Sequence, residues 1–239
     1  MMKKPFFLQG LKYGIPIALG YIPIAIAFGI LTASEGVPFL TGMLMSLTVF
    51  AGASQFVAVN LMSLGAAGGE IILTTFILNF RHFLMSASLS QRLEENTSLP
   101  YRGILSFGIT DETFSLASVT NLDESKKLPF SFLLGLMLIS FTAWNAGTWI
   151  GLFMGNILPD ILQNSMGIAL YVMFIGLLIP SMKSSFPIVV VALSAMLTHS
   201  AIVFIPWVPS FSTGWNIILS TMLGAFLGTI LFPKEDVNA

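Results

Sequence analysis

The sequence of 239 residues contains no cysteine, which excludes disulfides, thiolate nucleophiles and cysteine-ligated zinc or iron–sulfur centres. Charge is also scarce, because Asp, Glu, Lys and Arg make up 9% of the residues, whereas a soluble domain carries about 25%. The formal net charge is −1, and no basic cluster is large enough to neutralise a row of phosphates. These absences exclude nucleic-acid binding and redox chemistry on protein sulfur.

Signatures of catalysis are missing as well. The sequence has no Gly-x-Ser-x-Gly, no His-Glu-x-x-His and no phosphate-binding loop, and with two histidines it favours no catalytic metal site. We therefore expect no enzyme, no cofactor and no ATP site in this chain.

Long apolar stretches are what the sequence does contain. Hydrophobic residues make up 55% of the chain, and uncharged runs of roughly 20 residues, enough to cross a bilayer as helix, recur throughout. The connectors between them are short, so we predict one all-α transmembrane transport domain over 1–239, embedded in the lipid bilayer with about eight spans. The expected spans are 14–33, 39–63, 69–91, 103–121, 130–155, 162–181, 186–206 and 213–232.

Orientation follows from the Lys and Arg residues in short loops, since cytoplasmic loops carry the excess. Eight spans with a cytoplasmic N-terminus place most basic residues inside and only Arg92 and Arg102 in an outside loop. Both termini are then cytoplasmic. A re-entrant second span around Ala51 to Gln55 would turn that loop inward and put Lys126 and Lys127 on the wrong side, so eight crossing spans are preferred. The inside residues are Lys3, Lys4, Lys12, Lys126, Lys127, Lys183 and Lys234.

A weak internal similarity links the second and fifth spans. The run 46–54 resembles the run 140–148, and the two spans have opposite predicted directions. This is compatible with an inverted-topology repeat of spans one to three and four to six, although chance similarity is a competing explanation in so apolar a chain.

Ionisable residues inside the expected spans are concentrated at two points. Arg81 lies in the third span and Asp111 with Glu112 in the fourth, and a buried charge there needs a partner or water. Counted from the connecting loop, Arg81 and Asp111 lie at nearly the same depth, so Arg81 is expected to pair with Asp111 or Glu112. The alternative is that this pair only clamps two helices together.

Around both points, polar residues spaced three or four apart form stripes along one face of a helix. Thr75, Asn79, His82 and Ser86 share one face of the third span. Gly108, Asp111, Ser115 and Ser118 share a face of the fourth. Two stripes at one depth favour a hydrated cavity over lipid contact, and a clamp alone explains neither His82 nor Glu112.

Two segments are candidate helix breaks. Small residues run from Ala51 to Gln55, and the first span contains Pro16 and Pro23. In transporters such breaks expose amide groups to a substrate carboxylate. Close helix packing and ordinary proline kinks are the equally weighted alternatives.

Four motifs in order resemble the AzlC/YgaZ family of bacterial branched-chain amino acid permeases. They are Gly20-Tyr21-Ile22-Pro23 with Ala27-Phe28-Gly29, the run 51–56, Asn79-Phe80-Arg81-His82 and Thr110-Asp111-Glu112-Thr113-Phe114. The resemblance implies a bacterial cytoplasmic-membrane exporter of valine, leucine and isoleucine, with methionine also possible. It also implies a small membrane partner of the AzlD/YgaH type.

Roles follow from matching both charges of an amino acid at low dielectric. We expect Arg81, or the amides near Gly52, Ser54 and Gln55, to hold the carboxylate, and Asp111 or Glu112, with Asn79 nearby, to hold the ammonium. His82 or Glu112 would couple transport to protons. The alternatives are a small-solute channel and a non-transporting subunit that acts through its partner.

Overall fold

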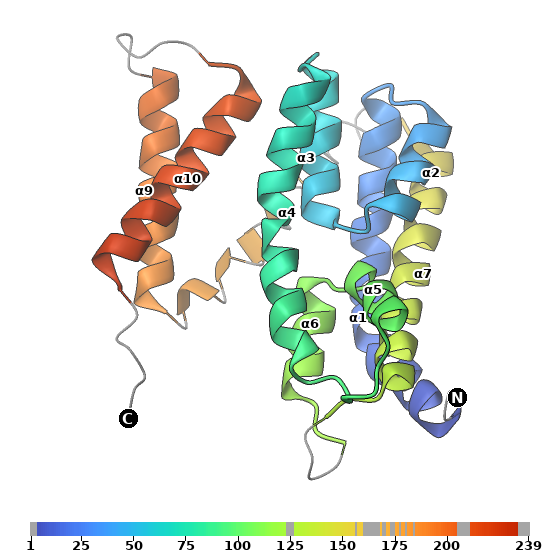
Figure 1. The fold of residues 1–239 in the computed structure, drawn as a ribbon. Coiled ribbons are helices and arrows are strands. Elements are labelled where there is room, and N and C mark those ends of the chain that lie inside the picture. The colour runs from blue at the N-terminus through green and yellow to red at the C-terminus, as the bar shows by residue number, and fades with distance from the viewer. Residues whose placement is uncertain are drawn as a thin grey trace. The chain divides into compact units, whose positions relative to one another are not determined.

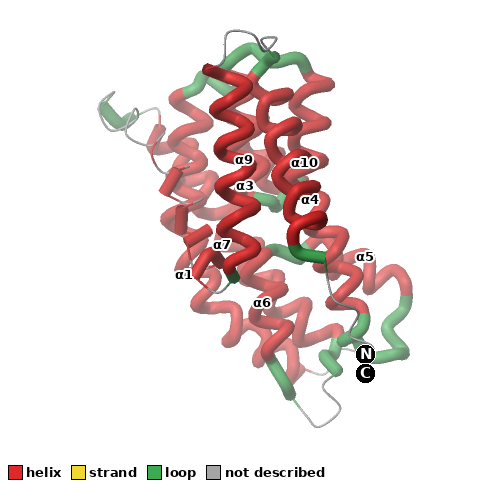
Figure 2. Tube along the Cα trace, turned by 90° about the vertical axis from the view of Figure 1, so that its left-hand side faces the viewer, coloured by secondary structure: helices red, strands yellow, loops and turns green. Residues whose placement is uncertain are grey.

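The computed structural model describes residues 4–122, 127–155, 157–159, 168, 171–172, 175–176, 178–179, 181–183, 185–204 and 211–233. The described residues form helices and loops without a strand (Figure 2). The helices are α1 (Lys4–Ser34), α2 (Phe39–Thr48), α3 (Gly52–Ser63), α4 (Gly68–Ser90), α5 (Leu99–Phe107), α6 (Asp111–Val119), α7 (Phe130–Gly155), α9 (Phe186–Phe204) and α10 (Thr213–Leu231). The chain divides into two compact units, Met1–Val59 with Leu78–Leu170, and Asn60–Ile77 with Tyr171–Ala239.

Five of the described helices are long and apolar enough to cross a membrane, namely α1, α4, α7, α9 and α10. The chain is thus an all-helical, multi-pass membrane protein. The predicted count of about eight spans is not confirmed, and the sixth expected span, 162–181, lies mostly outside the described residues.

Helices α1 and α7 run parallel to each other and make the most extensive helix–helix contact in the first unit, along small residues (Figure 1). A Cβ atom added at Gly29 would overlap the main-chain oxygen of Thr148, and one added at Gly151 would overlap that of Ile26. Such close backbone approach lets two apolar helices associate through van der Waals contact without a hydrophobic driving force.

Helix α1 continues through both of its prolines, Pro16 and Pro23. Of the two alternatives for the first span, the helix break does not form, because the helix is continuous. Membrane helices tolerate proline where neighbouring helices and local adjustments compensate for the lost hydrogen bond, and α7 supports α1 along much of its length.

The second expected span is a hairpin of two half-length helices, α2 and α3. Along α2, Gly42 lies against Leu152, Ser46 bonds to Thr148, and Phe50 reaches Phe141, so α2 runs antiparallel to α7. Helix α3 then turns back, because Phe56 on α3 contacts Phe28 on α1, beyond the level of Phe50. The chain returns toward the end from which α2 entered.

The fourth expected span is a second hairpin, α5 and α6, entering from the opposite end. Tyr101 contacts Phe130 at the start of α7, and Phe107 contacts Phe141 further along, so α5 runs parallel to α7. Helix α6 returns to the starting end, where the Arg92 guanidinium donates hydrogen bonds to the main-chain oxygens of Ala117, Ser118 and Thr120. Figure 1 shows α5 and α6 in the lower half and α2 and α3 in the upper half.

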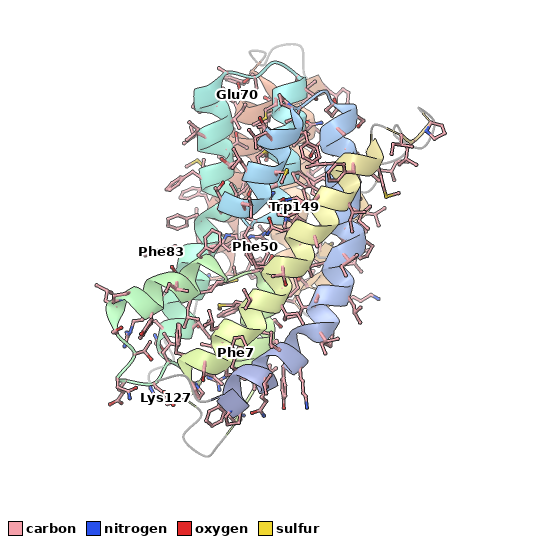
Figure 3. The ribbon with its side chains drawn as sticks, turned by 90° about the vertical axis from the view of Figure 1, so that its right-hand side faces the viewer. Phe7, Phe50, Glu70, Phe83, Lys127 and Trp149 are labelled. Atoms are coloured by element: carbon pink, nitrogen blue, oxygen red, sulfur yellow. The ribbon has the colours of Figure 1, made fainter. Side chains whose placement is uncertain are left out.

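Two hairpins overturn the prediction that the second and fourth spans cross. Because α5 and α6 return to their own side, the loop around Arg92 lies at the same end of the first unit as Lys127, whose Nζ donates to the Gln91 main-chain oxygen. Leu93 and Leu128 form a bridge there, and Figure 3 places Lys127 and Phe7 at this end. The basic loop predicted outside therefore shares one end with the N-terminal half of α1.

The helix breaks do not follow the predicted repeat. They lie in the second and fourth expected spans, whereas α7, the fifth, is continuous through the run 140–148. An inverted repeat of spans one to three and four to six stays a prediction without support from these breaks.

The second unit contains the antiparallel pair α9 and α10. Gly224 lies against Ala195 and Gly228 against Val191. Glu70 Oε1 accepts hydrogen bonds from Ser212 Oγ at 2.6 Å and from the Gly214 amide at 2.7 Å, which caps the start of α10.

Candidate functional site

The tips of the two hairpins meet at mid-height of the first unit. Phe50, the tip residue of α2–α3, lies 6.3 Å from the Phe107 ring at the tip of α5–α6 and 5.2 Å from Phe141 on α7. Phe50 has a positive φ of 43° and is 2% exposed, so a left-handed backbone conformation is held in place by packing. Figure 3 shows Phe50 midway along the helices.

Helix α6 begins at this meeting point. Its first turn is capped by Thr110, whose Oγ1 accepts from the Thr113 amide at 3.2 Å, while Thr113 Oγ1 accepts from the Thr110 amide at 2.8 Å. The amide-rich helix end carries a partial positive charge. Asp111 and Glu112 both belong to that first turn.

Arg81 on α4 pairs with Asp111. The guanidinium Nη1 lies 2.7 Å from Asp111 Oδ2, and the two side chains are 40% and 34% exposed. The predicted pairing of Arg81 with Asp111 or Glu112 is confirmed for Asp111. The partial exposure leaves both side chains accessible to a small molecule.

Glu112 has a different partner, Tyr21 on α1. Its Oε2 accepts a hydrogen bond of 2.5 Å from the Tyr21 hydroxyl, which also lies 2.6 Å from Thr110 Oγ1. The Tyr21 ring packs edge-on against Trp144 and Phe50. Adjacent carboxylates on α6 thus face separate partners on α1 and α4. Sequence reasoning did not assign a role to Tyr21, although it lies in one of the quoted motifs.

Two polar atoms on one turn of α4 are buried without a hydrogen-bond partner among the described residues. They are Asn79 Oδ1, an acceptor, and Arg81 Nε, a donor. His82, on the same turn, places Nδ1 3.2 Å from the Asn79 main-chain oxygen, which leaves its Nε2 as the other proton-binding atom. The Asn79 acceptor suits the ammonium group of a zwitterion, and the Arg81 donor suits its carboxylate.

Helix α3 also begins at the meeting point, at Gly52. A Cβ at Gly52 would press against the Trp144 ring. Gln55, 1% exposed, donates to Ser46 Oγ at 3.0 Å and accepts from Trp144 Nε1 at 3.1 Å, while Ser54 Oγ donates to the Ala51 main-chain oxygen. The Ser54 and Gln55 side chains therefore hold the break in place. The Gln55 amide donates to the Ala51 main-chain oxygen at 3.0 Å, so the amides that precede it in the first turn are the ligand groups at this end.

The predicted polar stripe on the fourth span does not form as one helix face. Helix α5 ends at Phe107 and α6 starts at Asp111, so Gly108 belongs to the turn and not to a shared stripe with Asp111. After the break, the first turn of α6 places Asp111 against Arg81 and Glu112 against Tyr21.

Comparisons with known proteins agree on the family. A family model described as AzlC protein matches residues 16–158. An uncharacterised membrane protein of Archaeoglobus fulgidus is 36% identical over 77% of this chain and 79% of its own length. The inner membrane protein YgaZ of Escherichia coli is 29% identical, over 74% of each chain.

The branched-chain amino acid transport protein AzlC of Bacillus subtilis is 31% identical over 63% of this chain and 58% of its own length. No solved structure matches the chain. The match of the family model contains both hairpins and the Arg81–Asp111 pair, so the residues that build this site are part of what is matched. This multi-pass membrane protein belongs to the AzlC family.

Proposed function

We propose that the chain is a secondary transporter that exports neutral apolar amino acids, chiefly valine, leucine and isoleucine and also methionine. The observation that carries the proposal is the turn of α4 where Asn79 Oδ1 and Arg81 Nε lack partners beside the Arg81–Asp111 pair. The name of the Bacillus subtilis relative supports the choice of branched-chain amino acids.

The binding site is proposed where the two hairpin tips meet. The substrate carboxylate binds Arg81 and the first amides of α3 at Gly52 and Ser54, since helix N-termini favour anions. Gln55 contributes by holding the break, because its own amide is bonded to Ala51. The ammonium binds Asp111 and Asn79 Oδ1. The apolar side chain packs against the aromatic rings at the tips, because a zwitterion entering low dielectric needs both charges matched and its apolar part buried.

Coupling to the proton gradient is assigned to His82 and Glu112. Glu112 accepts a hydrogen bond from the Tyr21 hydroxyl, so its protonation would weaken or reverse that bond and loosen the contact of α6 with α1. His82 adjoins Arg81, and a proton on it would add a second positive charge beside the carboxylate site. In this mechanism the α2–α3 hairpin closes the site from one side of the membrane, and the α5–α6 hairpin closes it from the other side, alternately.

The end of the first unit that carries Arg92, Arg102 and Lys127 is proposed to be cytoplasmic, in a bacterial inner membrane. Basic residues are retained on the cytoplasmic side of short loops. Because the α5–α6 hairpin returns to its own side, these three residues lie at one end, and this orientation makes that end cytoplasmic. Both chain termini are assigned to the same side.

A small membrane partner of the AzlD/YgaH type is proposed to cover part of the apolar surface. Helix α9 has no buried residue in the described structure and a nearly uninterrupted apolar sequence. Lipid and the partner would share this surface.

Counterflow of labelled leucine in proteoliposomes tests the proposed function. Wild-type protein, with and without its partner, is expected to show saturable, trans-stimulated uptake, which a channel would not show. Arg81→Gln, Asp111→Asn and Glu112→Gln should each reduce it, while Glu94→Gln in an exposed loop should not. Full activity in all three site variants would overturn the assignment, and efflux with and without a proton gradient tests coupling and direction.

A further inference from the structure

A cavity of about 310 Å³ lies between α4 and α5 in the first unit. This volume is at the lower end of the range for small-molecule sites, about 300 Å³ and upward. None of the site residues assigned above lines it. Its lining is Phe83, Ser86, Ala87, Leu89, Ser90 and Leu93 from α4 and the loop after it, and Arg102, Gly103, Leu105, Ser106 and Ile109 from α5 and the turn after it.

The cavity extends from the hairpin tips to the basic end of the unit. Its inner lining includes Ile109, which lies in the turn between α5 and α6, just before Asp111. Its outer lining includes Leu93 and Arg102, near the bridge between Leu93 and Leu128. Seven residues of α4 separate Phe83 from the helix end at Ser90, which corresponds to about 10 Å.

The lining suits an amphipathic solute. Leu89, Leu105 and Ile109 are 2–4% exposed and form an apolar floor, whereas Ser86, Ser90 and Ser106 contribute hydroxyl groups. The lining is mostly apolar, with Arg102 at one end, which suits a solute that has an apolar side chain and a carboxylate.

Two residues define the outer part of the cavity. Arg102 Nε donates to the Thr97 main-chain oxygen at 3.0 Å, which fixes the guanidinium at the cavity wall. At Gly103 an added Cβ would meet nothing within 4 Å, so the glycine leaves open space and not a packing contact. A cation beside open space attracts carboxylates.

We infer that this cavity is the vestibule through which the amino acid passes between the basic end of the unit and the Arg81–Asp111 pair, with Arg102 as the group that captures the substrate carboxylate. The inference rests on the proposed function for the identity of the solute. The vestibule itself rests only on the geometry between α4 and α5.

Sided thiol labelling tests the vestibule directly, because the chain has no cysteine of its own. Ser86→Cys and Ser106→Cys, each carried by the full chain in vesicles, should react with a membrane-impermeant charged thiol reagent added from the Lys127 side. Ile104→Cys, on α5 but outside the lining and 53% exposed, is the matched control and should not react. Leucine should slow labelling at Ser106→Cys.

The labelling result can overturn the inference. Reaction of Ser86→Cys and Ser106→Cys only from the opposite side, or no reaction while Glu94→Cys in the adjacent loop reacts, would exclude a vestibule at this end. If wild-type protein moves no leucine but the sided labelling holds, the proposed substrate fails while the vestibule stands.

Filling the cavity gives a second readout. Gly103→Phe should lower leucine counterflow about tenfold or more, because the ring would occupy open space that the solute would otherwise use, without lowering the melting temperature. Gly69→Phe, where an added Cβ also meets nothing within 4 Å, should leave transport unchanged. Arg102→Gln should raise the half-saturating leucine concentration about tenfold, the loss of one charge-assisted contact, at unchanged maximal rate. Normal transport by Gly103→Phe would overturn the inference.

Discussion

The hydroxyl of Tyr21 on α1 donates a hydrogen bond of 2.5 Å to the Glu112 carboxylate at the first turn of α6. Helix α1 is packed closely along α7, whereas α6 is the returning arm of a hairpin. This one contact therefore ties a fixed helix to an element whose tip lies beside Arg81. The bond gives Glu112 a partner other than Arg81. A change in the protonation of Glu112 would therefore alter a contact with α1.

Tyr21→Phe should reduce leucine counterflow while leaving the fold intact. The variant removes the bond to Glu112 but keeps the ring contacts with Phe50 and Trp144. Loss of one hydrogen bond to a charged group costs about 1.5–3 kcal/mol, so a rate loss of roughly tenfold or more is expected. Tyr13→Phe, on the same helix with an edge contact to Phe132, is the control. Equal transport by both variants would remove Tyr21 from the mechanism.

A double-variant cycle at Arg81 and Asp111 separates substrate binding from clamping. Arg81→Gln and Asp111→Asn alone should each destabilise the protein by leaving one charge unpaired, and the double variant should recover melting temperature because no lone charge remains. Transport should stay lost in the double variant if the pair contacts substrate. Recovery of leucine counterflow together with stability would establish a clamp.

Gly29→Ala should lower stability through the α1–α7 interface. The added methyl overlaps the main-chain oxygen of Thr148 and the amide of Leu152, and main chain cannot move aside like a flexible side chain. Overpacking of this kind costs about 1–3 kcal/mol. Gly20→Ala on the same helix meets nothing within 4 Å and should be nearly neutral. Thermal unfolding of both variants in detergent checks the difference, and equal melting temperatures would contradict the packing account.

Gln55→Leu should destabilise the α2–α3 hairpin. It leaves the buried Trp144 Nε1 without an acceptor and removes the donor to Ser46, a loss of about 1–3 kcal/mol for each unsatisfied buried group. Asn60→Leu, exposed on the same helix, is the matched control. The melting temperature is the readout. An unchanged value for Gln55→Leu would mean that the network does not hold the break.

Some of the hairpin signals were present in the sequence but were weaker than the hydropathy. Gly108 followed by Thr110, Asp111 and Glu112 is typical of a helix stop and a new N-cap. The stretch 103–121 is also apolar enough to span, so hydropathy favours one continuous helix there. The small run at 51–55 is a candidate break, but the direction of α3 after it depends on contacts with Phe28 and Trp144.

The candidate site was partly predictable for a geometric reason. A short loop joins the third and fourth spans, so counting residues from it placed Arg81 and Asp111 at one depth whether the fourth span crosses or returns. The partner of Glu112 was not predictable, because Tyr21 is 91 residues away and reaches α6 only through the packing of α1 against α7.

The sequence by itself determined that the chain is an all-helical membrane protein with scarce charge concentrated at Arg81 and Asp111. Composition and span length follow from the bilayer and need no knowledge of contacts. Only the tertiary structure decided that two spans are hairpins meeting at Phe50 and Phe107, and that α6 begins at Asp111 of the ion pair. Hydropathy measures whether a segment tolerates the membrane, whereas the direction of the chain after a break is set by what the next helix packs against.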